Sequence, residues 1–142
     1  MNPKEWVFDM PHSLRLTRAR QEFLVQVLPE FHRRWKLRTA LDVGCGVGYF
    51  SEFLHKQGFE VVAIDGREEN VQEARQRFPS IKFCSINIED KAVLQLGTFD
   101  LVLCFGLLYH LENPFQAIRN LYGLTDKVLL IESICTPGRV PQ

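Results

Sequence analysis

The sequence predicts an α/β protein with a doubly wound, mostly parallel sheet and helices on both faces. Two observations support this fold class: short apolar runs alternate with helical patterns along the chain, and the first run ends in a glycine-rich turn. Parallel neighbouring strands need crossover connections, and these place helices on both faces of a sheet. With 142 residues, 46% of them hydrophobic and 24% charged, the chain is long enough for one such unit.

About five strands are expected, each from one apolar run. The run from Val61 to Ile64 has no polar alternation, which suits a strand that is covered on both faces. The remaining strands are expected at residues 40–43, 81–86, 99–104 and 128–131. Helical spacing between the strands predicts a helix ending near Gly58, a helix closed by Pro79, and a third outlined by Phe115, Ile118, Leu121 and Tyr122.

A further helix is expected before the first strand. Ser13 is a candidate N-cap, and apolar residues recur at helical spacing before Pro29, namely Leu16, Ala19, Phe23, Leu24, Val27 and Leu28. We expect this helix to cover one face of the sheet. Residues 1–38 are therefore interpreted as an N-terminal helical lead-in or cap, and residues 39–142 as the ligand-binding α/β domain of a single globular unit.

The charge balance argues against large polyanionic partners. Seventeen basic residues match seventeen acidic ones, so there is no strong nucleic-acid signal. The arginine-rich stretch at 15–38 leaves open a solvated helical face or a polyanion contact. No run approaches the roughly 20 apolar residues that cross a bilayer, and the N-terminus lacks a signal peptide's apolar stretch. Since the four cysteines form no C-x-x-C pair, we expect a cytoplasmic protein without a metal site.

The glycine-rich turn is the first functional signal. Gly44, Gly46 and Gly48 follow the first strand, and Asp65 ends the second strand 21 positions after Gly44. Glycines allow a close backbone approach to a ligand, and a carboxylate at the end of the second strand can accept hydrogen bonds from both ribose hydroxyls of an adenosine cofactor. The spacing is G-x-G-x-G, with Tyr49 next, whereas dinucleotide folds prefer G-x-G-x-x-G. A tight turn without a ligand is the alternative interpretation.

Residues 41–48, Leu-Asp-Val-Gly-Cys-Gly-Val-Gly, resemble the first motif of the class I S-adenosylmethionine-dependent methyltransferases, and the similarity extends from about residue 39 to 132. The resemblance implies S-adenosylmethionine as cofactor and S-adenosylhomocysteine as product. It implies that Asp65 holds the ribose and that Asp42 either steadies the glycine loop or faces the cofactor's ammonium group. The expected cofactor-binding residues in this part are Asp42, Gly44, Cys45, Gly46, Gly48, Asp65 and Gly66.

Residues 85–90 resemble the adenine-binding segment of the same family. Asn87 stands where that family usually has an acidic residue. Its amide oxygen and the backbone N–H of Ile88 are the expected adenine contacts. A helix N-cap formed by Asn87 or by Asp90 is the alternative.

Residues 99–111 resemble the family's fourth-strand motif, whose end lies beside the transferred methyl group. Cys104 and Phe105 are therefore expected cofactor contacts. Tyr109 and His110 are the candidate catalytic residues, because a neutral imidazole can take a proton from an oxygen or nitrogen nucleophile near pH 7. Structural roles stay open, with His110 capping or packing a helix and Tyr109 packing.

The leading hypothesis is methyl transfer from S-adenosylmethionine to an O, N or C acceptor on a small molecule or a macromolecule. A non-catalytic cofactor-binding or scaffolding module is the alternative. Residues 106–114 are also similar to a subgroup that modifies the wobble uridine of transfer RNA, and the glycine spacing disfavours an NAD-dependent oxidoreductase. Because many family members cover the site with N-terminal elements, Trp6, Phe8 and His12 are candidates for a lid.

A complete domain of this family resembles a seven-stranded sheet, whereas five strands are counted here. In the family the remaining strands often contribute acceptor contacts. The run at 128–131 would then be an uncovered edge strand, which invites pairing with another chain. We therefore expect a homodimer through this edge or an unstable fragment, together with a methyl-acceptor substrate.

Overall fold

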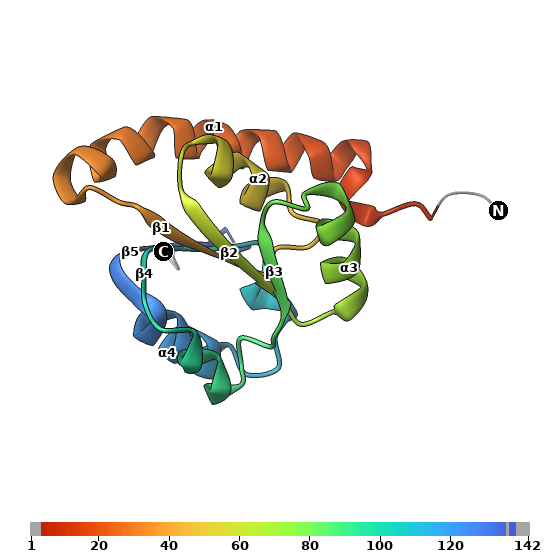
Figure 1. Cartoon of the computed structure of the whole chain (residues 1–142). Coiled ribbons are helices and arrows are strands. Elements are labelled where there is room, and N and C mark those ends of the chain that lie inside the picture. Colours follow the sequence, from red (N-terminus) through yellow and green to blue (C-terminus); the bar gives the residue numbers. More distant parts are fainter. Residues whose placement is uncertain (1–3, 136, 139–142) are drawn as a thin grey trace.

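The computed structural model describes residues 4–135, 137 and 138. Its centre is a five-stranded sheet in the order β3-β2-β1-β4-β5, in which every neighbouring pair is parallel (Figure 1). The fold class predicted from the sequence is confirmed, and each expected strand is present. The strands are β1 (Thr39–Val43), β2 (Glu60–Asp65), β3 (Lys82–Ser85), β4 (Phe99–Phe105) and β5 (Thr125–Glu132).

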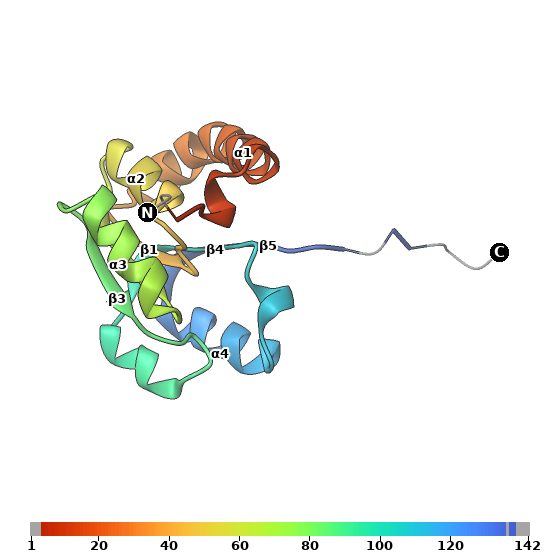
Figure 2. The ribbon, with the colours of Figure 1, turned by 90° about the vertical axis from the view of Figure 1, so that its right-hand side faces the viewer.

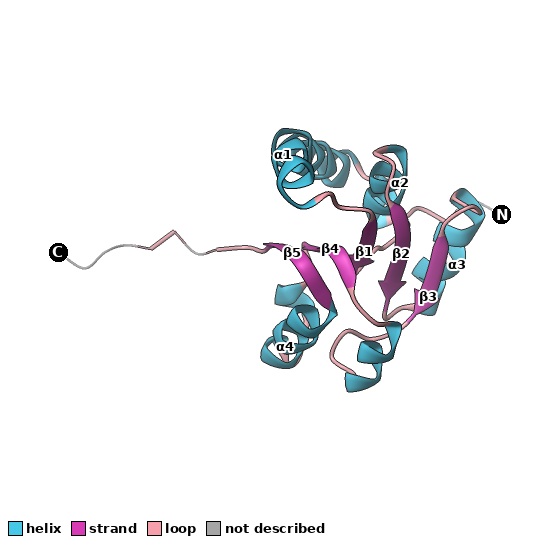
Figure 3. Cartoon of the chain, turned by 60° about the vertical axis from the view of Figure 1, so that its left-hand side comes forward, coloured by secondary structure: helices cyan, strands magenta, loops and turns pink. Residues whose placement is uncertain are grey.

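Helices cover both faces of the sheet, as expected (Figures 2 and 3). On one face lie α1 (Pro11–Trp35), α2 (Tyr49–Lys56) and α3 (Glu68–Arg77), and on the other lies α4 (Pro114–Leu124). Short 3₁₀ segments complete the connections: η1 (Val7–Asp9), η2 (Lys91–Leu96) and η3 (Leu108–His110). Among the described residues, no helix has the length and apolar character needed to cross a membrane.

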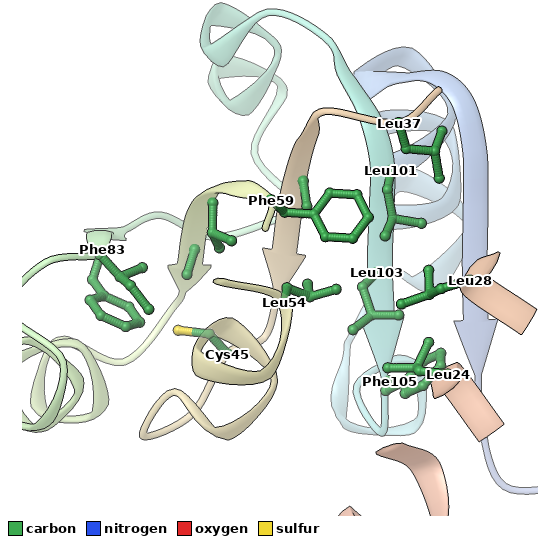
Figure 4. Packing of buried hydrophobic residues seen from close by; sticks show 14 of the residues in the cluster. Leu24, Leu28, Leu37, Cys45, Leu54, Phe59, Phe83, Leu101, Leu103 and Phe105 are labelled. Atoms are coloured by element: carbon green, nitrogen blue, oxygen red, sulfur yellow. The ribbon is translucent and has the colours of Figure 1, made fainter. Parts of the chain in front are cut away.

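Alternating side chains of the strands divide the core into two halves. Leu101, Leu103 and Phe105 of β4 belong to the half under α1 to α3, whereas Val102 and Cys104 belong to the half over α4. Both halves are apolar because both faces of a parallel sheet are covered. Figure 4 shows Leu24 and Leu28 of α1 beside Leu103 and Phe105, so α1 covers this face as predicted.

The bounds of α1 differ from the expectation. The helix begins at Pro11 rather than after a Ser13 cap, since proline at the first helical position lacks only an N–H that would have no partner there. It also continues through Pro29 to Trp35 and ends where Lys36 adopts a left-handed conformation. Pro29 removes one helical hydrogen bond, and the neighbouring Leu28 is buried in the core.

Much of the apolar stripe predicted for α1 is not covered. Leu24 and Leu28 are buried, but Leu16 and Phe23 are 43% and 48% exposed. A helix of 25 residues is about 38 Å long, whereas a strand of seven residues such as β4 spans about 23 Å. Leu16 and Phe23 lie beside the edge strand β5, near Leu130 and Ile131, where no further strand of the described chain covers them.

The buried face of α4 also differs from the one outlined in the sequence. Leu121 is buried as expected, but Phe115, Ile118 and Tyr122 are exposed. The buried side is completed by Ala117, Asn120 and Leu124. The buried Asn120 donates a 2.7 Å hydrogen bond to the carbonyl of Ile88, so a polar residue occupies a core position that apolar periodicity does not predict.

The strand order creates a crevice between the carboxyl ends of β1 and β4. The chain proceeds from β1 outward to β2 and β3, and from β4 outward to β5, so the connections diverge at this point. In the described part of the chain, β5 forms one edge of the sheet and β3 forms the other. The pairing of β5 with a second chain stays a prediction.

Substituting two glycines that have similar backbone conformations tests how tightly the first βα turn is packed. Gly48 and Gly58 have φ of 98° and 93°, but an added Cβ at Gly48 would lie 2.9 Å from the Phe78 ring, whereas none of the described atoms lies within 4 Å at Gly58. Gly58→Ala should cost about 1 kcal/mol of unfolding free energy, from backbone strain. Gly48→Ala should cost about 1–3 kcal/mol more, measured by urea unfolding. Equal losses would contradict close packing at Gly48.

Candidate ligand-binding site

Two cavities meet at the carboxyl ends of the strands, at the crevice between β1 and β4. One has a volume of about 240 Å³ and lies beside the ends of β1, β2 and β3. The other has a volume of about 290 Å³ and lies between the N-terminal segment and the end of β4. Gly44 and His110 line both, which makes the two cavities neighbours. The first cavity is lined by Val43, Gly44, Ile64, Asp65, Gly66, Arg67, Ile86, Asn87, Ile88, Glu89, Leu107, His110 and Leu111.

Asp65 is the polar centre of the first cavity. One carboxylate oxygen accepts a 2.9 Å hydrogen bond from the backbone N–H of Gly46. The other accepts from the backbone N–H of Arg67 at 2.9 Å and from the Asn70 amide at 3.2 Å. Since a carboxylate oxygen has two lone pairs, the oxygen bonded to Gly46 retains one free acceptor site. The bond between Asp65 and the glycine loop was not anticipated, because it depends on how β1 and β2 pair.

The three glycines of the loop have different roles. Gly44 has a φ of 74° and its N–H donates to the carbonyl of Ile64, which brings its backbone to the surface of both cavities. Gly46 lies under the Phe8 ring, since an added Cβ would meet that ring at 2.6 Å. Gly48 is the N-cap residue of α2 and lines neither cavity. Only the first of the three therefore borders the cavities directly.

Asp42 lies below the loop. It is 2% exposed, accepts a 2.6 Å hydrogen bond from the Ser51 hydroxyl of α2, and lines neither cavity. Burial raises its pKa to about 7, and the nearby charge of Asp65 adds to the increase. Between the two expected roles of Asp42, this geometry supports the steadying of the loop.

The two predicted cysteine contacts are buried thiols. Cys45 is 6% exposed and lines the second cavity, whereas Cys104 is fully buried in the core half over α4 and lines neither cavity. Burial raises the pKa of both, that of Cys104 to about 12, so neither thiol ionises readily. Any ligand contact of Cys104 would have to come from its backbone.

The predicted adenine segment lines the first cavity through Gly66, Asn87 and Ile88. The amide oxygen of Asn87 accepts a 2.9 Å hydrogen bond from the backbone N–H of Glu89, so that oxygen stabilises its own turn. Asp90 caps η2 by accepting from the N–H of Ala92. Of the two alternative N-caps, the structure has Asp90. Ile88 is buried and gives the cavity an apolar wall.

Phe105, Tyr109 and His110 meet at the second cavity. The rings of Tyr109 and His110 are 4.3 Å apart between centroids, and Tyr109 is 44% exposed. The side chain that caps α4 is Asn113, which accepts from the N–H of Gln116. His110 therefore does not cap that helix, and its position on both cavities places an imidazole at their junction.

The N-terminal segment crosses the glycine loop. Phe8 packs on Gly46 and lines the second cavity, while Trp6 and His12 line neither of the two cavities. Asp9 fixes this segment: its carboxylate accepts from Arg77 at 2.9 and 2.7 Å and from the Tyr49 hydroxyl at 2.6 Å. The hydrogen bonds from Arg77 hold the pKa of Asp9 below its usual value. Of the three lid candidates, only Phe8 borders the second cavity, and the lid stays a prediction.

Arg20 is a cavity residue that sequence reasoning did not single out. It lines the second cavity, and its Nη2 lies 2.8 Å from Oε2 of Glu132 at the end of β5. In the sequence Arg20 is one of several arginines in the basic stretch at 15–38, and nothing in the pattern separates it from the exposed ones. The contact exists only because α1 packs across the ends of β4 and β5.

Residues 41–127 match the model of a protein family described as a methyltransferase domain, which confirms the resemblance predicted from the glycine loop. A ubiquinone biosynthesis O-methyltransferase from Rickettsia felis is 30% identical over 124 residues, which cover 84% of this chain and 49% of the relative. The enzyme of the same name from Colwellia psychrerythraea is 39% identical over 83 residues, with coverages of 56% and 34%. The chain thus spans half or less of the length of these relatives.

The fold resembles solved methyltransferase structures. CalS10, an amino pentose methyltransferase from Micromonospora echinaspora with bound SAM, matches with a TM-score of 0.75 at 20% identity, over 96% of this chain and 61% of that one. Magnesium protoporphyrin IX methyltransferase from Synechocystis PCC 6803, also with bound SAM, matches with a TM-score of 0.67 at 24% identity, over 91% and 64%. Because both sequence identities are below 25%, the similarity to these structures shows a shared fold and nothing more specific.

The raised pKa of Asp42 predicts a pH dependence of stability. Its folded pKa of about 7 exceeds the ordinary value of 3.8, so between these values the folded chain keeps a proton that the unfolded chain has lost. The unfolding free energy should fall with rising pH in this window, by about 1.4 kcal/mol per pH unit from this group, and level off above pH 7. In urea unfolding at pH 5 to 8, Asp42→Asn should have the shallower slope. The exposed control Asp126→Asn should keep the wild-type slope, and parallel curves for Asp42→Asn would refute the assignment.

Asp9 should control the order of the N-terminal segment. Asp9→Asn removes the charge that holds Arg77, so backbone amide order parameters of residues 7–9 should fall from about 0.85 to below about 0.6 in NMR relaxation. Lys4→Met is the matched control, since the Lys4–Glu69 ion pair is more than half exposed on both sides and contributes little. An unchanged segment in Asp9→Asn, or equal loosening in both variants, would count against this role.

Proposed function

The chain belongs to the methyltransferase domain family, and from this premise we propose that it binds S-adenosylmethionine in the two neighbouring cavities and transfers the methyl group to an oxygen acceptor. The observation that supports this proposal most directly is the geometry of Asp65. Its carboxylate lies at the end of β2, retains a free acceptor site, and borders the same cavity as the backbone of Gly44. The names of the relatives, O-methyltransferases, favour oxygen among the possible acceptor atoms.

In this proposal the adenosine half occupies the cavity beside β2 and β3. Ile64, Ile88 and Leu107 provide apolar walls for a base, and Asn87 offers its amide N–H groups at the rim. The amino-acid end lies past Gly44, in the cavity that Phe8 borders. When bound, the cofactor would supply a methyl group on a sulfonium, from which the neutral thioether leaves readily, so the protein's task is mainly alignment.

The hydrogen bonds of Asp65 define how it holds a ribose. The oxygen bonded to Gly46 can accept from one hydroxyl without any rearrangement. The other oxygen already accepts two hydrogen bonds, so the second hydroxyl replaces the Asn70 amide, whose 3.2 Å bond is the longest of the three. Cofactor binding therefore releases Asn70 while the loop stays attached.

His110 is the proposed acceptor contact. It lies where the two cavities meet, beside Gly44, and so adjoins both the cofactor and an acceptor entering from the second cavity. A neutral imidazole there accepts the proton of an acceptor hydroxyl. Tyr109 contacts the imidazole ring and orients it, which is the packing role considered for this residue.

Calorimetry with S-adenosylhomocysteine tests cofactor binding. Asp65→Ala should weaken binding by about tenfold or more, because charge-assisted hydrogen bonds contribute about 1.5–3 kcal/mol. Asp126→Ala, a change at an exposed carboxylate on β5, should leave the affinity unchanged. Tight binding of NAD, no binding of S-adenosylhomocysteine, or an unaffected Asp65→Ala variant would each reject the proposal.

Transfer of tritiated methyl from S-adenosylmethionine to 1,2-dihydroxybenzene tests His110. His110→Gln should lower the rate about a hundredfold, as expected for loss of a general base, while affinity for S-adenosylhomocysteine stays within about threefold. His55→Gln, at an exposed histidine on α2, should transfer at the wild-type rate. Equal rates in the two variants would exclude the base role. Cofactor binding without transfer by the wild type would favour the non-catalytic module.

A further inference from the structure

Glu89 is a second carboxylate on the wall of the first cavity. It follows Ile88 in the loop after β3, and its side chain is half-buried. Among the described residues that line this cavity, only Asp65 and Glu89 have carboxylates. Since Asp65 is assigned to a ribose, Glu89 is the acidic group that remains for the rest of a ligand.

Hydrogen bonds from several directions hold Glu89 in place. Its backbone N–H donates to the amide oxygen of Asn87 at 2.9 Å, and its carboxylate oxygen Oε1 accepts from the backbone N–H of Asn113. The buried side-chain amide of Asn120 donates to the carbonyls of the residues before and after Glu89, at 2.7 and 3.3 Å. The loop and the carboxylate are thus ordered without a ligand, which limits the entropy that is lost when a ligand binds.

One carboxylate oxygen of Glu89 is left for a ligand. Oε1 is bonded to the N–H of Asn113, whereas no hydrogen bond or ion pair within the described part of the chain involves Oε2. The amide oxygen of Asn87, the other candidate acceptor, is already bonded within its own turn. An ionised carboxylate only accepts hydrogen bonds, so the group that fits beside Oε2 is an N–H or O–H donor.

We propose that Oε2 of Glu89 accepts a hydrogen bond from the exocyclic amino group of adenine and makes the cavity selective for 6-aminopurines; the inference rests on the proposed function. Once adenine is joined to a ribose, this amino group carries the only N–H donors of the base. A cavity that recognises adenine through this group therefore needs an acceptor there. Because Asp65 is assigned to the ribose and Asn87 to its turn, Glu89 takes that role, two positions after the residue that the sequence indicated.

Calorimetry with two ligands tests this assignment: S-adenosylhomocysteine, and the same molecule with unsubstituted purine in place of adenine. The wild type should bind the adenine compound about tenfold more tightly or better, because the purine compound lacks the charge-assisted hydrogen bond. Glu89→Gln should reduce this preference to below about twofold and leave the affinity for the purine compound within about twofold. The glutamine oxygen keeps the bond to Asn113, so its NH₂ group replaces Oε2 and offers a donor where the amino group needs an acceptor.

Glu112→Gln is the matched control, since Glu112 is exposed next to Asn113 and lines neither cavity, and it should retain the full preference. Asn87→Ala should weaken both compounds alike, because it loosens the turn without removing the acceptor of the base. A Glu89→Gln variant that keeps the preference, or that loses affinity for both compounds alike, overturns the proposal. So does a preference that disappears in Asn87→Ala.

Binding of S-adenosylhomocysteine to the wild type is measured first. Its absence rejects the proposed function and this inference with it. Equal binding of the adenine and purine compounds to the wild type rejects the role of Glu89 alone.

Discussion

The buried hydrogen bond from the Gly46 N–H to the Asp65 carboxylate is the interaction on which the site depends. It joins the loop after β1 to the end of β2 over 2.9 Å, and it gives a partner to a backbone N–H that would otherwise be buried alone. With this loop fixed, Gly44 borders both cavities and Phe8 has a flat glycine surface to pack on. The N-terminal segment and the strand ends thus share one anchoring point.

The two carboxylates near this anchor differ in their surroundings, because Asp65 borders a cavity and Asp42 does not. Asp42 is buried beneath the loop, where burial and the neighbouring Asp65 both raise its pKa and favour the protonated acid that bonds Ser51. Asp65 is bonded by N–H donors and borders a cavity. Because like charges close together are unfavourable, the charge of Asp65 adds to the effect of burial in disfavouring the ionised form of Asp42.

The strand ends and the exposed surfaces of α1 and β5 differ in how they are held in place. The proposed cofactor side consists of strand ends and a glycine backbone held by hydrogen bonds. Side chains on the surfaces of α1 and β5, such as Phe23 and Ile131, are less completely packed. Substitutions at these exposed positions of α1 and β5 should therefore leave the loop that Asp65 holds undisturbed.

The sequence by itself determined the strand order along the chain, the parallel sheet and the place of the loop with Asp65, because these follow from local periodicity and glycine spacing. The family followed from the resemblance of residues 41–48 to a known motif. It could not give the covered face of α4, because the polar Asn120 occupies a core position there. It also could not give the contact of Arg20 with Glu132, since several arginines of the basic stretch share the same pattern. Tertiary structure decided that Gly48 packs on aromatic rings rather than bordering the cavities, and that Cys104 faces the core. The physical reason is that hydrogen bonding and burial depend on which segments meet in space, and β1 meets both β2 and β4 only once the sheet has formed.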